Sequence, residues 1–262
     1  MSDIKISCLA SGSNGNAVYI ENHDSALLID CGISRREMLR RLRELSIDIS
    51  RIRALVITHE HLDHIRSADQ IATEFNLPVY LSRGTRLAAI EQNILTGCKM
   101  ESFRAGETFR IGDFDISTFR TSHDTLEPCG IVVNYRGVKT GVFTDLGSID
   151  KEISARFSEL DACILETNYD HKLLWDSPRP VWLKQRICGG IGHISNNEAG
   201  ELFNASAQKI RLLFLAHLSG ECNTRRIAYD TFMNISAERV KTLATRIVVT
   251  KRDQCTAIFP LE

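Results

Sequence analysis

Three of the eight histidines lie within six consecutive positions of the stretch THEHLDHI, residues 58–65. His59 and His61 stand two positions apart after the apolar run ALVI, so an extended backbone points both imidazoles to the same side. Asp63 and His64 follow where the chain turns into a helix, and they can serve a second ion nearby. Imidazole combined with carboxylate suits zinc, and also manganese, iron or nickel. The stretch therefore predicts a metal site at a strand end.

The same residues could instead form a polar loop at the start of a helix, with Asp63 as the helix cap. The spacing H-x-H-x-D-H favours metal binding, because each of its positions matches the needs of a metal ligand. A helical H-E-x-x-H zinc site fits poorly, since Asp63 stands four residues after His59, where the second histidine of that motif is required.

Three further polar residues end apolar stretches later in the chain. His123 follows FDISTFRTS, Asp145 follows VKTGVFT, and His217 follows RLLFLA. Two ions require more ligands than one motif supplies, and those ligands should lie at other strand ends. These three residues are therefore candidate ligands.

The composition bounds the class of protein. Hydrophobic residues make up 43% of 262 residues, and no repeat or linker divides the chain, so we predict one domain over residues 1–262. A formal net charge of -1 gives no global basic field that would indicate nucleic acid. The chain does not open like a signal peptide, and no apolar run approaches the roughly 20 residues that span a bilayer. We expect a cytoplasmic protein with no membrane partner. Its scattered cysteines are expected to be buried thiols.

Hydrophobic periodicity predicts strands and helices in alternation. Strands are expected at 4–10, 16–21, 25–30, 54–58, 79–82, 161–166, 211–217, 246–252 and 255–261, and hairpins at 107–119 and 130–145, turning at Gly112-Asp113 and Arg136-Gly137. Helices are expected at 34–45 with Ser34 as N-cap, at 64–75 and 84–95, near Ser195 and after Asn223. Hairpins mixed with strand-helix units predict an α/β protein, a four-layer αββα sandwich of two mixed sheets flanked by helices.

The ordered motifs closely resemble those of the metallo-β-lactamase fold superfamily of metallohydrolases. They are Asp30 in LLIDCG, the cluster at 59–64, His123 in TSHD, Asp145 in FTDLG and His217 in LAHLS. The stretches SCLASGSNGNAVYI, LETNYD and GGIGHISNNEAG resemble the YycJ/WalJ-type branch, which is associated with 5′-to-3′ DNA exonuclease activity. The chain lacks the inserted cap domain of the β-CASP nucleases and a long exosite arm of the tRNA-processing kind.

The resemblance implies two divalent metal ions, zinc or manganese, with iron or nickel as further options. His59, His61 and His123 would bind one ion; Asp63, His64 and His217 would bind the other. Asp145 would bridge both, and Asp30 would orient ligands through hydrogen bonds. A metal-bridging hydroxide would then be the nucleophile. Asp63, Asp145 and His193 are the expected catalytic residues.

His193 carries the separate prediction of a contact with a phosphate. It precedes Ser195, and Ser195 with Glu198 forms a capping-box pattern that opens a helix, whose N-terminus favours anions. The imidazole could contact a scissile phosphate or protonate the leaving oxygen. It could also be a structural histidine that bonds a carbonyl of a glycine-rich loop.

Other candidate substrate contacts come from two loops. Ser13, Asn14 and Asn16 in SGSNGN could cradle a phosphate with backbone amides or simply turn between strands. Asn168 and Asp170 end a strand, where they could face the site or close a turn. Ser195 is a further candidate contact. Glu60 is expected to face solvent or a neighbouring loop.

These patterns leave three functions open. The favoured one is a two-metal phosphodiesterase acting on a nucleic-acid partner, DNA in the first instance. The same ligands would suit hydrolysis of a small ester, thioester, lactone or cyclic phosphodiester, and a non-catalytic metal-binding regulatory protein is the third class. Arg36, Arg40 and Arg43 share a helical face that could track a nucleic-acid backbone, although a solvated amphipathic face explains them as well and is the commoner case, so they are weak support for DNA. The native metal and the oligomeric state are not indicated.

Overall fold

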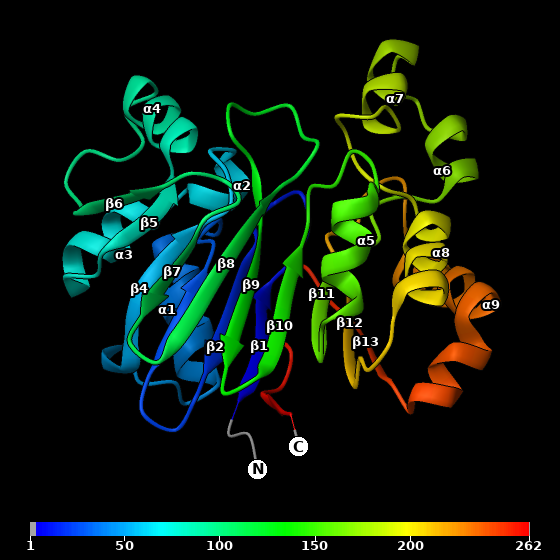
Figure 1. The fold of residues 1–262 in the computed structure, drawn as a ribbon. Helices are drawn as coiled ribbons and strands as arrows, with labels where there is room; N and C mark the ends of the chain where they lie inside the picture. Colours follow the sequence, from blue (N-terminus) through cyan, green and yellow to red (C-terminus); the bar gives the residue numbers. More distant parts are fainter. Residues whose placement is uncertain (1–3, 262) are drawn as a thin grey trace. The chain divides into compact units, whose positions relative to one another are not determined.

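The structure is a computed structural model that describes residues 4–261. The chain divides into two compact units. The first unit comprises the residues up to Arg120, Thr125–Gly137 and the residues from Lys251 on; the second comprises Thr121–Asp124 and Val138–Thr250. Two mixed sheets of seven strands each, flanked by helices, confirm the predicted α/β sandwich class (Figure 1). The prediction of a single domain stays a prediction.

One seven-stranded sheet lies wholly in the first unit, in the order β14-β1-β2-β3-β4-β5-β6. Its strands are β1 (Lys5–Ala10), β2 (Ala17–Glu21), β3 (Ala26–Ile29), β4 (Ile52–Ile57), β5 (Val79–Ser82), β6 (Met100–Phe103) and β14 (Phe259–Pro260). Strands β3 to β6 run parallel to one another, so their carboxyl ends meet at one edge. The loop that carries residues 58–65 leaves β4 at that edge.

The first unit also holds the strands β7 (Thr108–Ile111), β8 (Phe114–Arg120) and β9 (Cys129–Tyr135). Antiparallel pairing of Ile111 with Phe114 confirms the first predicted hairpin. Phe109 of β7 stacks on Tyr80 of β5 and Phe103 of β6, with ring centroids 5.3 and 4.9 Å apart. These apolar contacts join β7 to the sheet of the first unit.

Helices of the first unit are α1 (Arg35–Glu44), α2 (Leu62–Ile65), α3 (Ala68–Phe75) and α4 (Arg83–Glu91), together with a short 3-10 turn at Ile49–Arg51. Ser34 caps α1 as predicted, accepting a hydrogen bond from the Glu37 amide. The prediction of a single helix at 64–75 is wrong, because the helix is interrupted at Ser67 and divides into α2 and α3. The Ser67 hydroxyl donates to the Ile33 carbonyl at 2.7 Å, and the Ser67 amide donates to Cys31.

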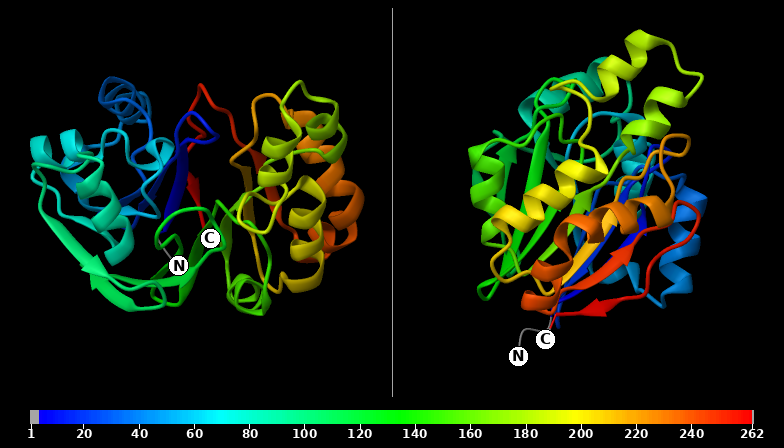
Figure 2. Two further views of the ribbon diagram at one scale, coloured as in Figure 1. Left: turned by 90° about the horizontal axis from the view of Figure 1, so that it is seen from above. Right: turned by 90° about the vertical axis from the view of Figure 1, so that its right-hand side faces the viewer.

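The second unit contains four parallel strands, ordered β10-β11-β12-β13. They are β10 (Val138–Phe143), β11 (Ala162–Glu166), β12 (Leu212–Ala216) and β13 (Arg246–Val249). Its helices are α5 (Lys151–Ser158), α6 (His171–Asp176), α7 (Val181–Ile187), α8 (Asn196–Ser206) and α9 (Arg225–Leu243). Figure 2 shows α8 and α9 side by side along these strands. Ser195 starts α8 with the predicted capping box.

Several elements lie outside the sequence-based expectations. Strand β6 and the helices α5, α6 and α7 were not anticipated, and β13 pairs with β12 while β14 pairs with β1, so the last two strands belong to different sheets. The described residues contain no helix that combines the length and apolarity needed for a membrane span.

Candidate metal centre

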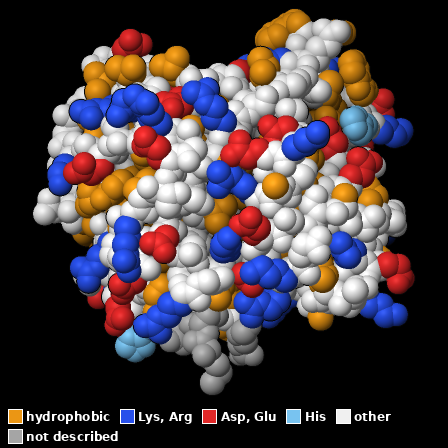
Figure 3. Space-filling view, in the orientation of Figure 1, with side chains coloured by type: hydrophobic (Ala, Val, Ile, Leu, Met, Phe, Trp, Pro, Cys, Tyr) orange, Lys and Arg blue, Asp and Glu red, His pale blue; other side chains and the backbone are white. Residues whose placement is uncertain are grey.

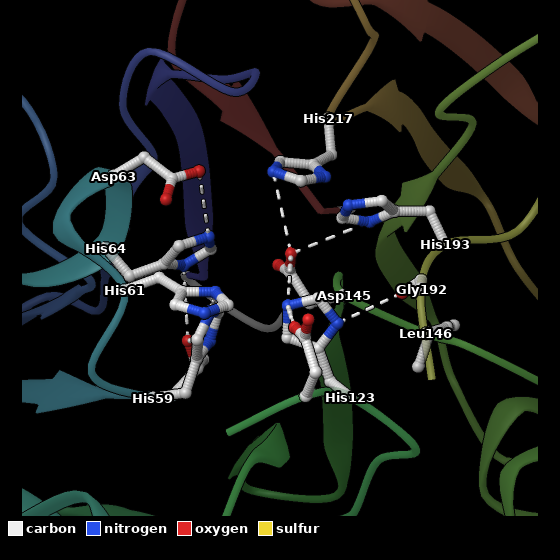
Figure 4. Close-up of polar contacts among 12 residues, drawn as sticks. His59, His61, Asp63, His64, His123, Asp145, Leu146, Gly192, His193 and His217 are labelled. Carbon is white, nitrogen blue, oxygen red and sulfur yellow. Dashed lines mark hydrogen bonds and ion pairs between the residues drawn. The ribbon is translucent and has the colours of Figure 1, made fainter. Parts of the chain in front are cut away.

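The loop after β4 gathers three imidazoles and a carboxylate within the first unit; we call His59, His61, Asp63 and His64 the first donor set. His59 Nε2 lies 3.2 Å from His61 Nδ1, and the rings of His59 and His64 have centroids 4.1 Å apart. His64 Nε2 lies 3.5 Å from Asp63 Oδ2. His64 is fully buried, whereas the Asp63 side chain is 22% exposed. The structure therefore brings the four predicted ligands together (Figure 4).

Asp30, at the end of β3, fixes the orientation of this loop. Its Oδ2 lies 2.7 Å from His64 Nδ1, and its Oδ1 accepts from the Thr58 amide at 2.9 Å. The Thr58 hydroxyl donates to the same carboxylate. Because a carboxylate accepts, Nδ1 of His64 carries the proton, and Nε2 is left as the nitrogen with a lone pair. That tautomer is the one a metal ligand requires.

The SGSNGN turn packs against the same loop through Asn16. Its side-chain amide Nδ2 lies 3.0 Å from His64 Nε2, and its backbone amide donates to the Asp63 carbonyl at 2.7 Å. Asn16 is buried, whereas Ser13 and Asn14 are exposed. Asn16 thus acts on the ligand loop directly, and a role of Ser13 and Asn14 at a phosphate stays a prediction.

A second donor set lies in the second unit and comprises His123, Asp145, His193 and His217. From Asp145 Oδ1, the distances are 3.5 Å to His123 Nε2, 3.7 Å to His217 Nε2 and 3.8 Å to His193 Nδ1. The His123 ring is held from behind, because its Nδ1 lies 3.0 Å from the Gly192 carbonyl oxygen. Figure 4 shows the imidazoles turned toward the Asp145 carboxylate.

Glu166, the last residue of β11, is a functional residue that the sequence analysis missed. Its Oε1 lies 2.7 Å from His193 Nδ1 and 3.0 Å from His217 Nδ1, and its Oε2 accepts from the Leu146 amide at 2.8 Å. Burial alone would raise the pKa of Glu166, but His193 and His217 outweigh burial and hold this pKa below its usual range. Glu166 is therefore a buried carboxylate that orients two imidazoles.

The sequence carries a partial signal for Glu166, although the partners of this residue depend on the strand order. Glu166 ends the apolar stretch DACIL, just as Asp145 and His217 end theirs, and β11 lies between β10 and β12 in a parallel sheet. Carboxyl ends of adjacent parallel strands meet at one edge, so a charged residue at this place must face its neighbours there.

The candidates around β11 have structural contacts of their own. Asn168 is buried, donates to the His217 carbonyl at 2.9 Å and lies 3.3 Å from His217 Nδ1. Asp170 caps α6 by accepting from the Leu173 amide, and the fully buried Ser195 caps α8. Asn168 is thus placed to orient His217, and contacts of these residues with substrate stay predictions.

Three of the predicted site residues have left-handed backbone conformations. Asp30, Asp145 and His217 have φ values of 61°, 57° and 54°, and each directly or nearly follows the end of a strand. Such φ values are uncommon for residues other than glycine, and they cluster at functional sites because the surrounding structure must hold them. The sharp turn redirects each side chain after its strand ends.

Glu60 lies within the first motif but serves the fold. It is buried; its Oε1 accepts from the Leu126 amide at 2.8 Å and its Oε2 from the Thr85 hydroxyl at 3.2 Å. The expectation that Glu60 faces a neighbouring loop is confirmed by its contact with Leu126, whereas the alternative that it faces solvent is wrong because the residue is buried.

The donor chemistry of both sets fits a divalent metal. In the second unit, ligand atoms of Asp145, Glu166, His193 and His217 all lie within 4.8 Å of one another. His64, His123 and His217 each hold Nδ1 against a carboxylate or carbonyl oxygen, which leaves Nε2 as the ligating nitrogen. Imidazoles backed by such acceptors are typical of metal sites.

Known proteins resemble this chain along most of its length. A family model described as a beta-lactamase superfamily domain matches residues 26–218. The exodeoxyribonuclease WalJ of Streptococcus pneumoniae serotype 2 (strain D39) is 32% identical over 250 residues, which cover 91% of each chain. The exodeoxyribonuclease YycJ of Bacillus anthracis is 28% identical over 239 residues, which cover 90% of each chain.

Solved structures agree on the fold. The metallo-β-lactamase fold protein YhfI from Bacillus subtilis has a TM-score of 0.74 with this chain at 18% identity, covering 98% of this chain and 99% of that one. At this identity the similarity concerns the fold.

Proposed function

Because the chain belongs to the metallo-β-lactamase fold superfamily, in its YycJ/WalJ branch, and is a metal-dependent hydrolase, we propose that it degrades DNA from the 5′ end. The two relatives named exodeoxyribonucleases match about nine tenths of the chain, which supports a nucleic-acid substrate. The observation that carries the proposal is the second donor set, in which Glu166 holds His193 beside Asp145.

The proposed centre binds two divalent ions, zinc or manganese. His59, His61 and His123 would hold one ion, Asp63, His64 and His217 would hold the other, and Asp145 would contribute to both; Asp30 orients His64. Bound ions of this kind lower the pKa of a water to near neutrality and polarise the phosphoryl oxygen under attack.

His193 supplies the contact with the phosphate. Its Nδ1 lies 2.7 Å from Glu166 Oε1, so the carboxylate fixes the ring and the proton on that nitrogen. When the ring carries a second proton, on Nε2 at its opposite side, that nitrogen can donate to a phosphoryl oxygen or to the leaving oxygen. The His193 side chain is 22% exposed, whereas the Glu166 side chain behind it is fully buried. The imidazole is therefore accessible to a substrate, and the carboxylate that orients it is shielded from solvent.

The test is degradation of DNA and RNA, single- and double-stranded, labelled at the 5′ or the 3′ end, with manganese or zinc added. We expect mononucleotides from the 5′ end of DNA, loss of turnover in Asp145→Asn, and at least a 100-fold lower rate in His193→Ala. His23→Ala is the matched control, because His23 is an exposed histidine, with its side chain 78% accessible.

Release of mononucleotides from the 3′ end would disprove the proposed polarity. Equal rates of degradation on RNA and DNA would disprove the proposed preference for DNA. Turnover of a small phosphodiester or thioester without cleavage of any polymer would replace the proposal by hydrolysis of a small substrate.

A further inference from the structure

Both tryptophans of the chain lie exposed on the helices α6 and α7. Trp175 is 48% exposed and Trp182 is 64% exposed, and Val181 next to it is 59% exposed. Tryptophan is highly buried on average, so two exposed indoles on one short segment indicate a surface with a partner. Figure 3 shows hydrophobic side chains gathered at the upper right, where Figure 1 places α7.

The helix pair is firmly attached to the second unit. The ammonium group of the buried Lys184 donates to the Trp175 carbonyl at 2.6 Å, which ties α7 to α6. Leu174 packs with Tyr169 and Cys222 in a small buried cluster. The indoles are therefore presented by an ordered scaffold, and their exposure is a built feature.

The end of α7 reaches the loops of the second donor set. The Arg186 guanidinium pairs with Asp124, the residue after His123. The Ser122 hydroxyl donates to the Gly190 carbonyl at 2.7 Å, and the His193 amide donates to the Ile187 carbonyl at 2.8 Å. The tryptophan-bearing segment is thus continuous with the loops that hold His123 and His193.

The exposed indoles, rather than net charge, characterise this surface. Residues 171–187 contain four basic residues, Lys172, Arg179, Lys184 and Arg186, and one acidic residue, Asp176. Lys172 pairs with Asp176, Arg179 with Glu221 and Arg186 with Asp124, and Lys184 is buried against the Trp175 carbonyl, so these charges are largely balanced locally. Exposed aromatic rings are a usual means of binding unpaired bases by stacking.

We infer that the α6–α7 segment, residues 171–187, is a stacking surface that holds unpaired bases of a single-stranded nucleic acid next to the hydrolytic site. The inference rests on the proposed function and adds where the strand is held. Stacking is tolerant of sequence because every base has an aromatic face, so this surface binds strands of any sequence.

The indole fluorescence of the full chain tests the inference directly, since both tryptophans belong to the segment. We expect oligothymidylate with phosphorothioate linkages, added to the manganese-loaded protein, to quench this fluorescence. Trp182→Leu and Trp175→Leu should each weaken binding roughly ten-fold, as expected for one lost base stack, and Trp182→Phe should restore most of the affinity. Tyr229→Leu, an exposed aromatic residue on α9, is the control and should bind as the wild type does.

Unchanged affinity in both leucine variants, equal quenching by a blunt duplex, or quenching by anionic phospholipid vesicles in place of the strand would each overturn the inference. Degradation of labelled DNA by the wild type is measured separately. Nuclease activity with unaltered binding in the variants rejects the stacking surface and leaves the proposed function standing, whereas strand binding without hydrolysis rejects the function alone.

Discussion

Glu166 connects two of the four residues of the second donor set, because its Oε1 contacts both His193 and His217. Replacement by glutamine keeps the size but removes the charge that holds two imidazoles in place. We expect Glu166→Gln to bind manganese or zinc about 10- to 100-fold more weakly, the usual effect of losing the acceptor behind a ligating histidine. Competition with a chromogenic chelator measures the affinity.

The matched control is Glu201→Gln, which changes an exposed glutamate on α8. Its metal affinity should equal that of the wild type. Wild-type affinity in Glu166→Gln would show that Glu166 does not support the metal ligands.

The proximity of the side chains within each donor set was predictable from residue types and spacing; their roles as ligands stay predictions, and their supports were not predicted. Histidines and aspartates at strand ends are visible in the sequence, and both donor sets contain the residues expected. Glu166 and the contact of Asn168 with His217 depend on which strands are neighbours, and strand order cannot be read from periodicity. The supporting contacts therefore emerge only with the topology.

At the scale of elements, Gly32 sets the distance between the loop after β3 and the loop of the first donor set. A Cβ at Gly32 would lie 1.6 Å from the Asp63 carbonyl oxygen, and backbone cannot yield as a flexible side chain can. We expect Gly32→Ala to lower the free energy of unfolding by about 3 kcal/mol or more and to displace the ligand loop. Urea unfolding and metal affinity measure the two effects.

Gly190→Ala is the control for this substitution, since an added Cβ there meets no atom within 4 Å. It should change stability by less than about 1 kcal/mol. If Gly32→Ala unfolded at the same urea concentration as the wild type, the close approach of the two loops would be disproved.

Helix α1 is anchored through an acidic residue in its first turn. Hydrogen bonds from Arg40, and then from Arg41, lower the pKa of Glu37 from 4.5 to about 2, although burial opposes them. The buried Arg41 also donates to the Leu9 carbonyl, so Glu37 supports a contact between α1 and β1. Glu37→Gln should reduce the free energy of unfolding by about 1 kcal/mol at neutral pH.

The pH dependence of this effect follows from the lowered pKa. Stability from the ionised Glu37 is fully present above pH 4.5 and is lost as the pH falls toward 2, so the wild type and Glu37→Gln should converge over that range. Urea unfolding at pH 7, 5 and 4 follows the difference. Glu44→Gln, which removes only an exposed contact with Arg40, is the control, and a difference that grew on acidification would contradict the role of Glu37.

The limits of sequence-based prediction at this scale have local causes. The helix expected at 64–75 was wrong because Ser67 bonds the loop after β3 and so ends α2, a long-range contact that helical periodicity does not encode. Helices α6 and α7 are short and carry exposed tryptophans, so neither shows a regular apolar face. Long amphipathic or capped helices, such as α1 and α8, were predicted correctly.

At the scale of the whole molecule, the first donor set belongs to one compact unit and the second to the other. If the proposed ions take ligands from both sets, metal binding stabilises both units at once, by an amount that grows with the metal concentration relative to Kd. At about 100 times Kd this stabilisation is roughly 2.7 kcal/mol, and for a chain of this size it should raise Tm by about 5–10 °C.

Calorimetry with manganese or zinc, and again after removal of the metal with EDTA, makes this measurable. We expect one sharper transition with metal, and a lower, broader or divided transition without it, because the stabilisation that bound metal supplies is then lost. His59→Ala, in the first unit, and His217→Ala, in the second, should each abolish the metal-dependent rise in Tm, although each removes a ligand from only one unit. If either variant kept the full rise, the ions would be bound by one unit alone, and the assignment of ligands from both donor sets would have to be abandoned.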